Sequence, residues 1–294
     1  MKKMKFCMIV LGVMLLLAGC NAEADGGETA GLPEYPIIDG SSTTVVMHEA
    51  IKTYLTGELN PYIQHSRTYP ALERLDPRSE NPADVILAVK HYDDTIAEFR
   101  SRGADLVITP IAKEGFVFMT HPDNPVDNLT LEQLRGIYSG EITNWKDVGG
   151  FDEDIVAYTR NKDSGSQTAL EDFMDGIPIV LGEDPDRIAT SMGEMLGAVY
   201  MTGRSAIGYN MYSWAMEQWV EYDQLKLFAI DGIEPSNETL SDSSYPLMVY
   251  TYSYYNVNNE KGRALTEWLL SAEGQELIES VGFVGIQSDS LSDD

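Results

Sequence analysis

The fold is decided by two similar stretches of sequence, IDGSSTT at residues 38–44 and TRNKDSGSQT at residues 159–168. Each stretch follows a short apolar run, contains several small hydroxyl residues and precedes a pattern with helical spacing. After the first stretch, apolar residues recur at helical spacing from Met47 to Leu55, and the pattern stops at Gly57. A strand, a short loop and a helix in this order make a βα unit, so the two stretches predict an α/β fold.

Short apolar runs alternate with helical patterns through the rest of the chain. A Thr-x-x-Gln capping box at residues 130–133 predicts one helix start, and Leu265, Trp268 and Leu269 predict the buried side of a helix at residues 261–270. This alternation predicts mixed or parallel sheets flanked by helices. The predicted strands are residues 35–38, 84–89, 105–109, 115–119, 155–158, 206–209, 225–230 and 247–252.

Both stretches have the features of an anion-binding loop. A loop of small residues at a helix start presents free N–H groups and the positive end of the helix dipole. Arg160, four residues before Ser164-Gly165-Ser166, could add a clamp of two parallel hydrogen bonds on an oxyanion. A plainer interpretation stays open, because Ser164 and Gln167 also match a capping box and Arg160 could be a surface residue paired with a carboxylate.

The first 20 residues, MKKMKFCMIVLGVMLLLAGC, predict a secretory signal peptide, because lysines precede an uncharged apolar run. Its end, Leu-Ala-Gly-Cys20, is similar to a bacterial lipobox, which predicts cleavage before Cys20 and lipidation of that residue. A transmembrane anchor is the alternative, although the apolar run is shorter than the ~20 residues that a spanning helix needs. Residues 21–31 are predicted to form a flexible tether and residues 288–294 a disordered tail.

Charge, cysteine content and motifs exclude several classes of protein. Removal of the three signal-peptide lysines leaves 17 of the 20 basic residues against 47 acidic ones, which excludes a nucleic-acid partner. With Cys20 lipidated, the mature chain has no cysteine for a disulfide or a Cys-zinc site. The four histidines lack metal-ligand spacing and are expected in solvated or capping positions. No nucleophile-elbow or Walker motif is present, so we expect neither enzymatic activity nor a cofactor nor a metal.

Longer motifs resemble one known family. The motifs are IDGSSTT, TPIAKEGFVF, DNPVDNLTLEQLRGIYSGEITNWKDVGG, RNKDSGSQTALEDF, AIGYNMYSW, YPLMVYTYSYY and WLLSAEGQELIESVGFVGI. Together, over residues 35–286, they resemble the periplasmic-type phosphate-binding proteins of the Pst system, especially the lipoprotein forms of Gram-positive bacteria. The resemblance implies the type II periplasmic-binding-protein fold, in which two lobes joined by two strand crossings close on phosphate. It places lobe I at residues 32–115 and 247–287 and lobe II at residues 116–246.

The resemblance also implies a site and partners. The phosphate-binding residues that it implies are Ser42, Thr43, Thr44, Arg160, Ser164, Gly165, Ser166 and Gln167. The protein would be a monomer that passes inorganic phosphate to the permease and ATPase of an ABC importer. Its only membrane contact would be the lipid at Cys20, on the extracytoplasmic face of the bacterial cell membrane.

The chain departs from the family pattern at the acidic positions that would accept the phosphate proton. Lys90 and Lys162 stand there, and Asp39, Asp84 and Asp163 are candidate replacements. Without an acceptor, discrimination of phosphate against sulfate is expected to be weak. The alternatives are therefore a binding protein for another oxyanion, such as sulfate, molybdate or a phosphonate, and a surface sensor lipoprotein of the same fold. A secreted phosphohydrolase would need a nucleophile with a base, or a metal cluster, and the sequence shows neither.

Overall fold

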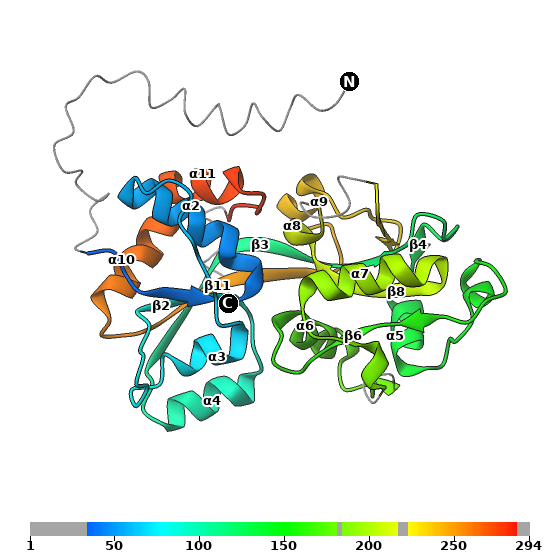
Figure 1. The fold of residues 1–294 in the computed structure, drawn as a ribbon, viewed down its shortest axis with the longest axis horizontal. Coiled ribbons are helices and arrows are strands. Elements are labelled where there is room, and N and C mark those ends of the chain that lie inside the picture. Colours follow the sequence, from blue (N-terminus) through cyan, green and yellow to red (C-terminus); the bar gives the residue numbers. More distant parts are fainter. Residues whose placement is uncertain (1–33, 181–183, 217–222, 287–294) are drawn as a thin grey trace, which may run out of the picture.

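The computed structural model describes residues 34–180, 184–216 and 223–286. The signal peptide, Cys20, the tether and the tail predicted from the sequence lie outside these residues. Figure 1 shows the described elements in two groups side by side, one coloured blue, cyan and orange to red, the other mainly green and yellow; we call them lobe I and lobe II. Among the helices in these ranges, none combines the length and apolar character that a membrane crossing needs.

The described strands form one large hydrogen-bonded sheet and two short ladders. The large sheet has the order β1-β2-β11-β3-β8-β5 with β9 beside β3, and the ladders pair β4 with β10 and β6 with β7. The strands are β1 (Ile38–Gly40), β2 (Val85–Val89), β3 (Leu106–Thr120), β4 (Asn128–Leu129), β5 (Val156–Ala157), β6 (Thr159–Arg160), β7 (Ile188–Ala189), β8 (Ala206–Met211), β9 (Lys226–Leu227), β10 (Ala229–Ile230) and β11 (Met248–Asn256).

The helices cover this sheet in both lobes. The α-helices are α2 (Val45–Thr56), α3 (Thr68–Glu73), α4 (Asp93–Ser101), α5 (Leu131–Ser139), α6 (Gly165–Met174), α7 (Met192–Thr202), α8 (Tyr212–Ala215), α9 (Asn237–Ser241), α10 (Glu260–Leu269) and α11 (Ala272–Ser280). The short 3₁₀ helices are η2 (Ser42–Thr44), η3 (Trp145–Val148), η5 (Pro185–Arg187) and η6 (Gly203–Ser205). The first predicted helix is confirmed as α2, and Gly57, with a positive φ of 71°, caps its C-terminus.

The longest strand, β3, belongs to both lobes (Figure 1). Its residues up to Gly115 pair with β11, and residues 116–119 pair with β8. The sequence predicts separate strands at 105–109 and 115–119, but the chain stays extended through Pro110. The register with β11 shifts beside this proline: Pro110 lies opposite Tyr252 and Ala112 opposite Thr251, so Ile111 is the extra residue of a β-bulge. The α/β fold with strands passing between two lobes, expected from the sequence, is confirmed.

In lobe I both faces of the sheet are covered, because every residue of β2 is buried. Alternate residues of a strand point to opposite faces. Val85 and Leu87 pack with α2, α10 and α11, whereas Ile86 and Ala88 pack with α3 and α4. Figure 1 shows these two sets of helices on opposite sides of the sheet. The sheet of lobe I is therefore the middle of three layers, and its strand ends are held from both sides.

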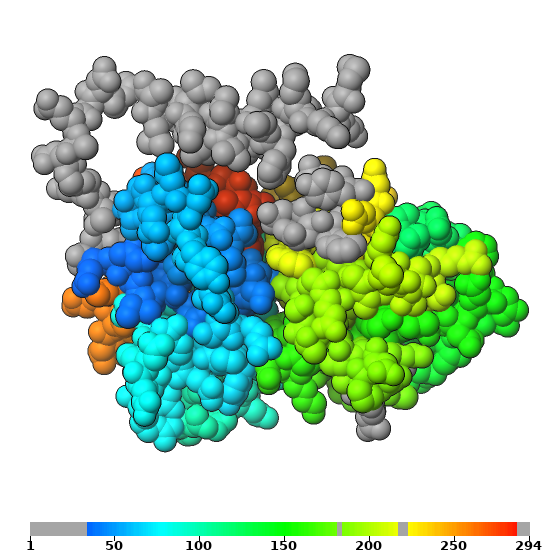
Figure 2. Space-filling model, viewed as in Figure 1, coloured from blue at the N-terminus to red at the C-terminus, as the bar shows by residue number. Residues whose placement is uncertain are grey.

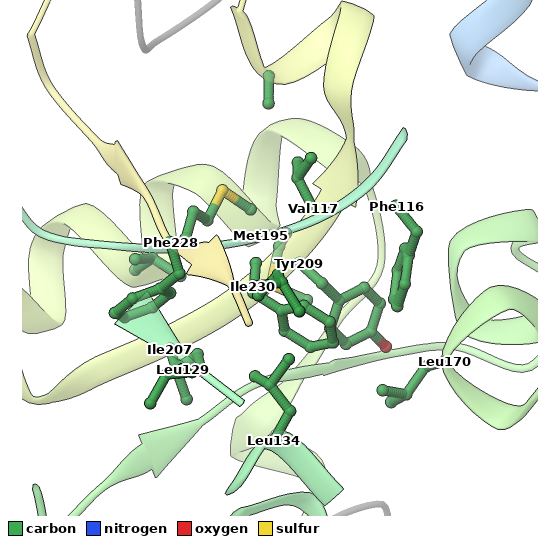
Figure 3. Packing of buried hydrophobic residues seen from close by; sticks show 14 of the residues in the cluster. Phe116, Val117, Leu129, Leu134, Leu170, Met195, Ile207, Tyr209, Phe228 and Ile230 are labelled. Atoms are coloured by element: carbon green, nitrogen blue, oxygen red, sulfur yellow. The ribbon is translucent and has the colours of Figure 1, made fainter. Parts of the chain in front are cut away.

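The core of lobe II surrounds β8 and the second half of β3 (Figure 3). Val117 and Tyr209 from these strands lie against Leu134 of α5, Leu170 of α6 and Met195 of α7, all in one buried cluster. The predicted capping box at the start of α5 is confirmed by both of its hydrogen bonds. The strand predicted at 225–230 is divided into β9, which pairs with β3, and β10, which pairs with β4. This core fixes α6 with its first residues toward lobe I.

A buried carboxylate lies where β3 leaves lobe I. Glu114 is only 2% exposed. It accepts hydrogen bonds from the Gly115 N–H at 3.0 Å, the Ser213 N–H at 3.1 Å and the Ser213 hydroxyl at 2.5 Å. Burial raises the pKa of this carboxyl, and the hydrogen bonds from Ser213 and Gly115 oppose that shift only in part.

Replacement of Glu114 should change how stability depends on pH. Because the folded-state pKa lies above the unfolded one, this group favours folding below the unfolded pKa and loses that contribution as pH rises through the folded pKa. In Glu114→Gln, the amide oxygen can accept from both N–H groups, and the amide N–H can donate to Ser213. We expect the difference in unfolding free energy, variant minus wild type, to increase by about 1 kcal/mol or more from acidic to neutral pH. Urea unfolding at several pH values measures it, with the exposed Glu80→Gln as control; parallel pH profiles for Glu114→Gln and wild type would contradict it.

Candidate functional site

The two anion-loop stretches meet in one pocket between the lobes. The first follows β1 and leads through η2 into α2, and the second follows β6 and leads into α6. Figure 2 shows the surfaces of lobe I, in blue and cyan, and lobe II, in green, directly against each other. Lobe I lines the pocket with Ser41, Ser42, Thr43, Arg67, Thr68 and Val89, and lobe II with Arg160, Ser164, Gly165, Ser166, Met192 and Met211.

Free backbone N–H groups face this region from both loops. The first residues of a helix have no carbonyl one turn earlier to bond to. Among the described residues, no acceptor is found for the N–H groups of Ser42 and Thr43 before α2, nor for those of Gly165 and Ser166 at the start of α6. Two helix starts, each with unsatisfied donors, therefore serve one pocket.

Arg160 places a buried positive charge in the same pocket. It is 6% exposed, its Nε donates to the Ala189 carbonyl at 3.1 Å and its Nη1 donates to the Ser166 hydroxyl at 3.3 Å. No carboxylate in the described ranges lies within ion-pair distance of it. Burial lowers the pKa of Arg160, the charge of Arg67 lowers it further, and Tyr209 and Glu194 act against this. The plainer interpretation, a surface arginine paired with a carboxylate, is wrong for Arg160.

Six of the eight residues that the sequence predicts for the site line the pocket, and Thr44 and Gln167 do not. The Thr44 hydroxyl donates to the Leu87 carbonyl at 2.7 Å. The Gln167 side-chain oxygen accepts from the Arg160 N–H at 3.1 Å and from the Tyr209 hydroxyl. The predicted capping box at Ser164 is thus half formed: Ser164 accepts from the Gln167 N–H at 3.1 Å, but the Gln167 side chain holds the backbone of Arg160.

Among the lining residues that were not predicted from the sequence, Arg67 is the charged one. It stands at the N-cap of α3 with a positive φ of 78°, and its side chain is exposed at the pocket. Ser41, Thr68, Val89, Met192 and Met211 were not predicted either. A signal was present, because Ser66-Arg67 precedes a helix that begins at Thr68 and has Pro70 in its first turn, a hydroxyl-before-helix pattern like that of the two predicted loops.

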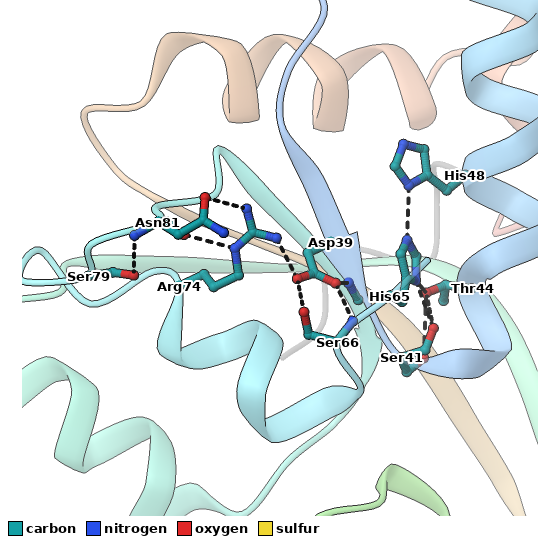
Figure 4. Close-up of polar contacts among 10 residues, drawn as sticks. Asp39, Ser41, Thr44, His48, His65, Ser66, Arg74, Ser79 and Asn81 are labelled. Carbon is teal, nitrogen blue, oxygen red and sulfur yellow. Dashed lines mark hydrogen bonds and ion pairs between the residues drawn. The ribbon is translucent and has the colours of Figure 1, made fainter. Parts of the chain in front are cut away.

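None of the candidate acidic acceptors lines the pocket. Asp39 is held behind it, by the Ser66 N–H and hydroxyl at 2.7 Å each and by Arg74 at 2.6 Å (Figure 4). Burial alone would raise the pKa of Asp39, but the hydrogen bonds from Ser66, Arg74 and Gly40 lower it overall. Asp84 accepts from the Ile37 N–H and from Asn259, and Asp163 is exposed.

Lys90 and Lys162, which stand at the family's acidic positions, also lie outside the pocket lining. Lys162 is exposed, and Lys90 forms a surface ion pair with Asp93 at 3.2 Å. Within the described ranges, no group of three or more His, Cys, Asp or Glu side chains is arranged to hold a metal ion. The charged groups of the pocket lining are therefore the two guanidinium groups.

A buried histidine pair supports the first loop (Figure 4). His65 Nδ1 lies 2.8 Å from the Ser41 carbonyl, and His65 Nε2 lies 2.9 Å from His48 Nδ1. A carbonyl only accepts, so His65 donates from Nδ1 and, when neutral, accepts from His48. Burial lowers the pKa of both rings, that of His48 to about 3. The expectation of solvated or capping histidines is wrong for this pair.

The His65 hydrogen bond orients the peptide between Ser41 and Ser42. In a trans peptide the C=O and N–H point in opposite directions. With the Ser41 carbonyl held by His65, the Ser42 N–H points to the other side of the loop. The Ser41 carbonyl also accepts from the Thr44 N–H at 3.2 Å, so a second hydrogen bond holds this peptide.

Loss of the His65 donor should therefore weaken binding of inorganic phosphate, the ligand that the sequence predicts. We expect His65→Leu to weaken it about three- to tenfold, the value of one hydrogen bond. His65→Asn, whose amide nitrogen can take the place of Nδ1, should bind nearly as tightly as the wild type. Calorimetry at pH 7.5, with melting temperatures measured in parallel, tests this; equal losses in the two variants would show that the ring matters only for packing.

Comparisons with known proteins agree with this architecture. Residues 48–273 match the PBP superfamily domain. The phosphate-binding protein PstS of Borreliella burgdorferi is 28% identical over 211 residues, which cover 69% of this chain and 73% of that protein. The PstS of Staphylococcus saprophyticus is 26% identical over 302 residues, covering 97% and 91%.

Solved structures show the same fold. A Clostridium perfringens protein, assigned as a phosphate ABC transporter substrate-binding protein and solved with bound phosphate, superposes with a TM-score of 0.66 at 25% identity, covering 85% of this chain and 99% of that one. A Vibrio cholerae ABC-type phosphate transport receptor has the same fold, with a TM-score of 0.61 at 21% identity over 85% and 99% of the two chains. Because the domain match spans well over half of the sequence, this chain belongs to the PBP superfamily.

Proposed function

We propose that this protein is an extracytoplasmic solute-binding protein that captures inorganic phosphate between its lobes and delivers it to an ABC importer. The observation that carries the proposal is the buried guanidinium of Arg160, which has no carboxylate partner in the described ranges and lies beside the starts of two helices. An oxyanion bound there would supply the missing charge and accept the free N–H groups. The names of the relatives, phosphate-binding proteins, support phosphate as that anion.

In this proposal the phosphate is bound by hydrogen bonds from both lobes. Ser42 and Thr43 bind from lobe I, whereas Arg160, Ser164, Gly165 and Ser166 bind from lobe II. Thr44 and Gln167 hold the loops in place from behind. The protein acts as a monomer, with lobe I at residues 32–115 and 247–287 and lobe II at residues 116–246.

The close approach of the lobes supports binding by closure. A Cβ atom on Gly165 would lie 2.1 Å from Cγ2 of Val89, far inside van der Waals contact. Glycine at the start of α6 therefore lets lobe II reach the end of β2 in lobe I. The apolar side chains of Val89, Met192 and Met211 keep water from part of the pocket lining, which strengthens hydrogen bonds to a bound anion.

Arg160→Ala tests the proposal directly. Loss of a charged partner of a buried anion costs ~2–5 kcal/mol, so phosphate affinity should fall by about one and a half to more than three decades. Arg135→Ala is a matched control, because Arg135 also lies in lobe II and also donates its Nε to a backbone carbonyl, that of Phe173 at 3.0 Å, but does not line the pocket. Calorimetry with purified protein measures both. Unchanged affinity in Arg160→Ala, or equal losses in the two variants, would overturn the assignment of Arg160.

We further propose that the lipid on Cys20 anchors the mature protein to the outer face of the cell membrane of a Gram-positive bacterium. The support is the charged start, the apolar run and the Leu-Ala-Gly-Cys end of the leader. Cys20→Ser should abolish labelling with a radioactive or clickable fatty acid and leave the unprocessed precursor. Labelling and mature size equal to those of the wild type would refute the anchor without affecting the assignment of the pocket.

A further inference from the structure

The charged groups that line the pocket, Arg67 and Arg160, are both positive. From this we infer that the pocket selects its ligand by the ligand's charge and not by a proton that the ligand carries. It binds a fully ionised tetrahedral dianion, so sulfate competes with the dianionic form of phosphate. Arg67 is a residue that determines this specificity. The inference rests on the proposed function, which concerns the same pocket.

Three carboxylates near the pocket are engaged elsewhere, and Asp163, beside Ser164, is exposed and outside the pocket lining. Asp39 is bound by Ser66 and Arg74. Glu194, the acid on α7 whose charge acts on Arg160, accepts from the Thr190 N–H at 2.7 Å and from the Thr190 hydroxyl at 2.6 Å. Glu171 of α6 accepts from the Gln167 amide at 3.0 Å. None of these carboxylates lines the pocket, so none is in place to accept a proton from a bound anion.

The hydroxyl groups of the second loop are arranged to donate. Ser166 accepts from Arg160, Ser164 accepts from the Gln167 N–H, and the two serine hydroxyls are 3.5 Å apart, so at least one of their protons is left for a ligand. A hydroxyl that already accepts from an N–H keeps its own proton for another partner. In the first loop, the Ser41 and Thr43 hydroxyls lie 2.6 Å apart, so one donates to the other and one proton is left over. Together with the free N–H groups, the pocket offers an anion mainly donors.

Arg67 supplies the second positive charge. Its position follows from its place at the N-cap of α3, where its carbonyl accepts from the Ala71 N–H at 2.9 Å. Among the described residues it makes no ion pair, and it acts on Arg160 as a like charge. Two positive charges in one pocket repel each other, and a bound anion offsets this repulsion. A dianion neutralises both charges.

Phosphate and sulfate respond to pH in different ways. Phosphate changes between monoanion and dianion in the neutral range, whereas sulfate is a dianion throughout. A site with a carboxylate acceptor can reject the ligand that lacks the proton by ~10⁴ or more. A site that contains only hydrogen-bond donors does not discriminate between phosphate and sulfate in this way. It binds phosphate less tightly as pH falls, because the monoanion replaces the dianion.

The protein groups around the pocket do not account for a loss of phosphate affinity at lower pH. Burial lowers the pKa of His65 and His48 behind the first loop. Burial raises the pKa of Tyr209 behind Arg160, and the hydrogen bonds to Asp39 and Glu194 lower the pKa of those carboxyls. These shifts favour the neutral form of the histidines and of Tyr209 and the ionised form of the carboxyls, so near neutral pH the main change of charge is that of phosphate.

The test is calorimetric binding of inorganic phosphate and of sulfate from pH 5.5 to 8.5 at a constant ionic strength of about 0.15 M. We expect sulfate to bind within about a hundredfold of phosphate near pH 8, in place of a gap of ~10⁴. The ratio of phosphate to sulfate affinity should fall about tenfold per pH unit below the second ionisation of phosphate. The ratio cancels any effect of pH on the protein that both ligands share.

Variants separate the role of Arg67 from that of the two lysines at the family's acidic positions, Lys90 and Lys162. Arg67→Ala should weaken both sulfate and dianionic phosphate about tenfold, whereas Arg67→Lys should retain most of the affinity. Lys90→Ala and Lys162→Ala, which remove exposed cations outside the pocket, should leave both affinities within about twofold.

The outcomes distinguish the inference from the proposed function. Tight phosphate binding with no displacement by a thousandfold excess of sulfate would overturn the inference and leave phosphate capture standing. A phosphate affinity that is independent of pH would do the same. Sulfate binding without phosphate binding would overturn phosphate capture and support a dianion site. If neither ion bound, both conclusions would fall.

Discussion

The structure depends on one electrostatic constraint, a guanidinium group buried between two lobes with no described carboxylate beside it. A buried charge without a partner is costly, so its surroundings must supply the compensation. The protein supplies part of it through the Ala189 carbonyl and the Ser166 hydroxyl, which fix the direction of the Arg160 side chain. The rest falls to a ligand that carries negative charge, which is why we assign this pocket to an oxyanion.

The polar groups behind each loop give the pocket its shape. In lobe II, Gln167 and Tyr209 hold the backbone of Arg160. In lobe I, His65 holds the Ser41 carbonyl (Figure 4). Arg74 and Ser66 hold Asp39, which stands two residues before Ser41 in the sequence. These buried groups are satisfied by one another, so the loop N–H groups stay available for a ligand. A pocket whose donors are already oriented loses less entropy when it binds.

The long strand β3 connects this local chemistry to the whole fold. It pairs with β11 in lobe I and with β8 in lobe II, so its backbone around Gly115 joins the two lobes (Figure 1). Glu114 lies at this point and accepts hydrogen bonds from Gly115 and Ser213. The same short segment thus joins the lobes and bears a carboxyl whose burial disfavours its ionisation.

The sequence by itself determined the features that depend on neighbours along the chain. The βα units, the capping box at Thr130 and the apolar side of α10 follow from local periodicity, and six of the eight predicted residues line the pocket because the Ser/Thr loops are continuous in sequence. Only the tertiary structure decided which polar side chains turn toward the pocket. Thr44 and Gln167 bond to distant partners, Leu87 and Tyr209, and Arg67 enters from a third segment. Spacing along a chain carries no record of such contacts, because they arise only when two lobes bring separate loops together.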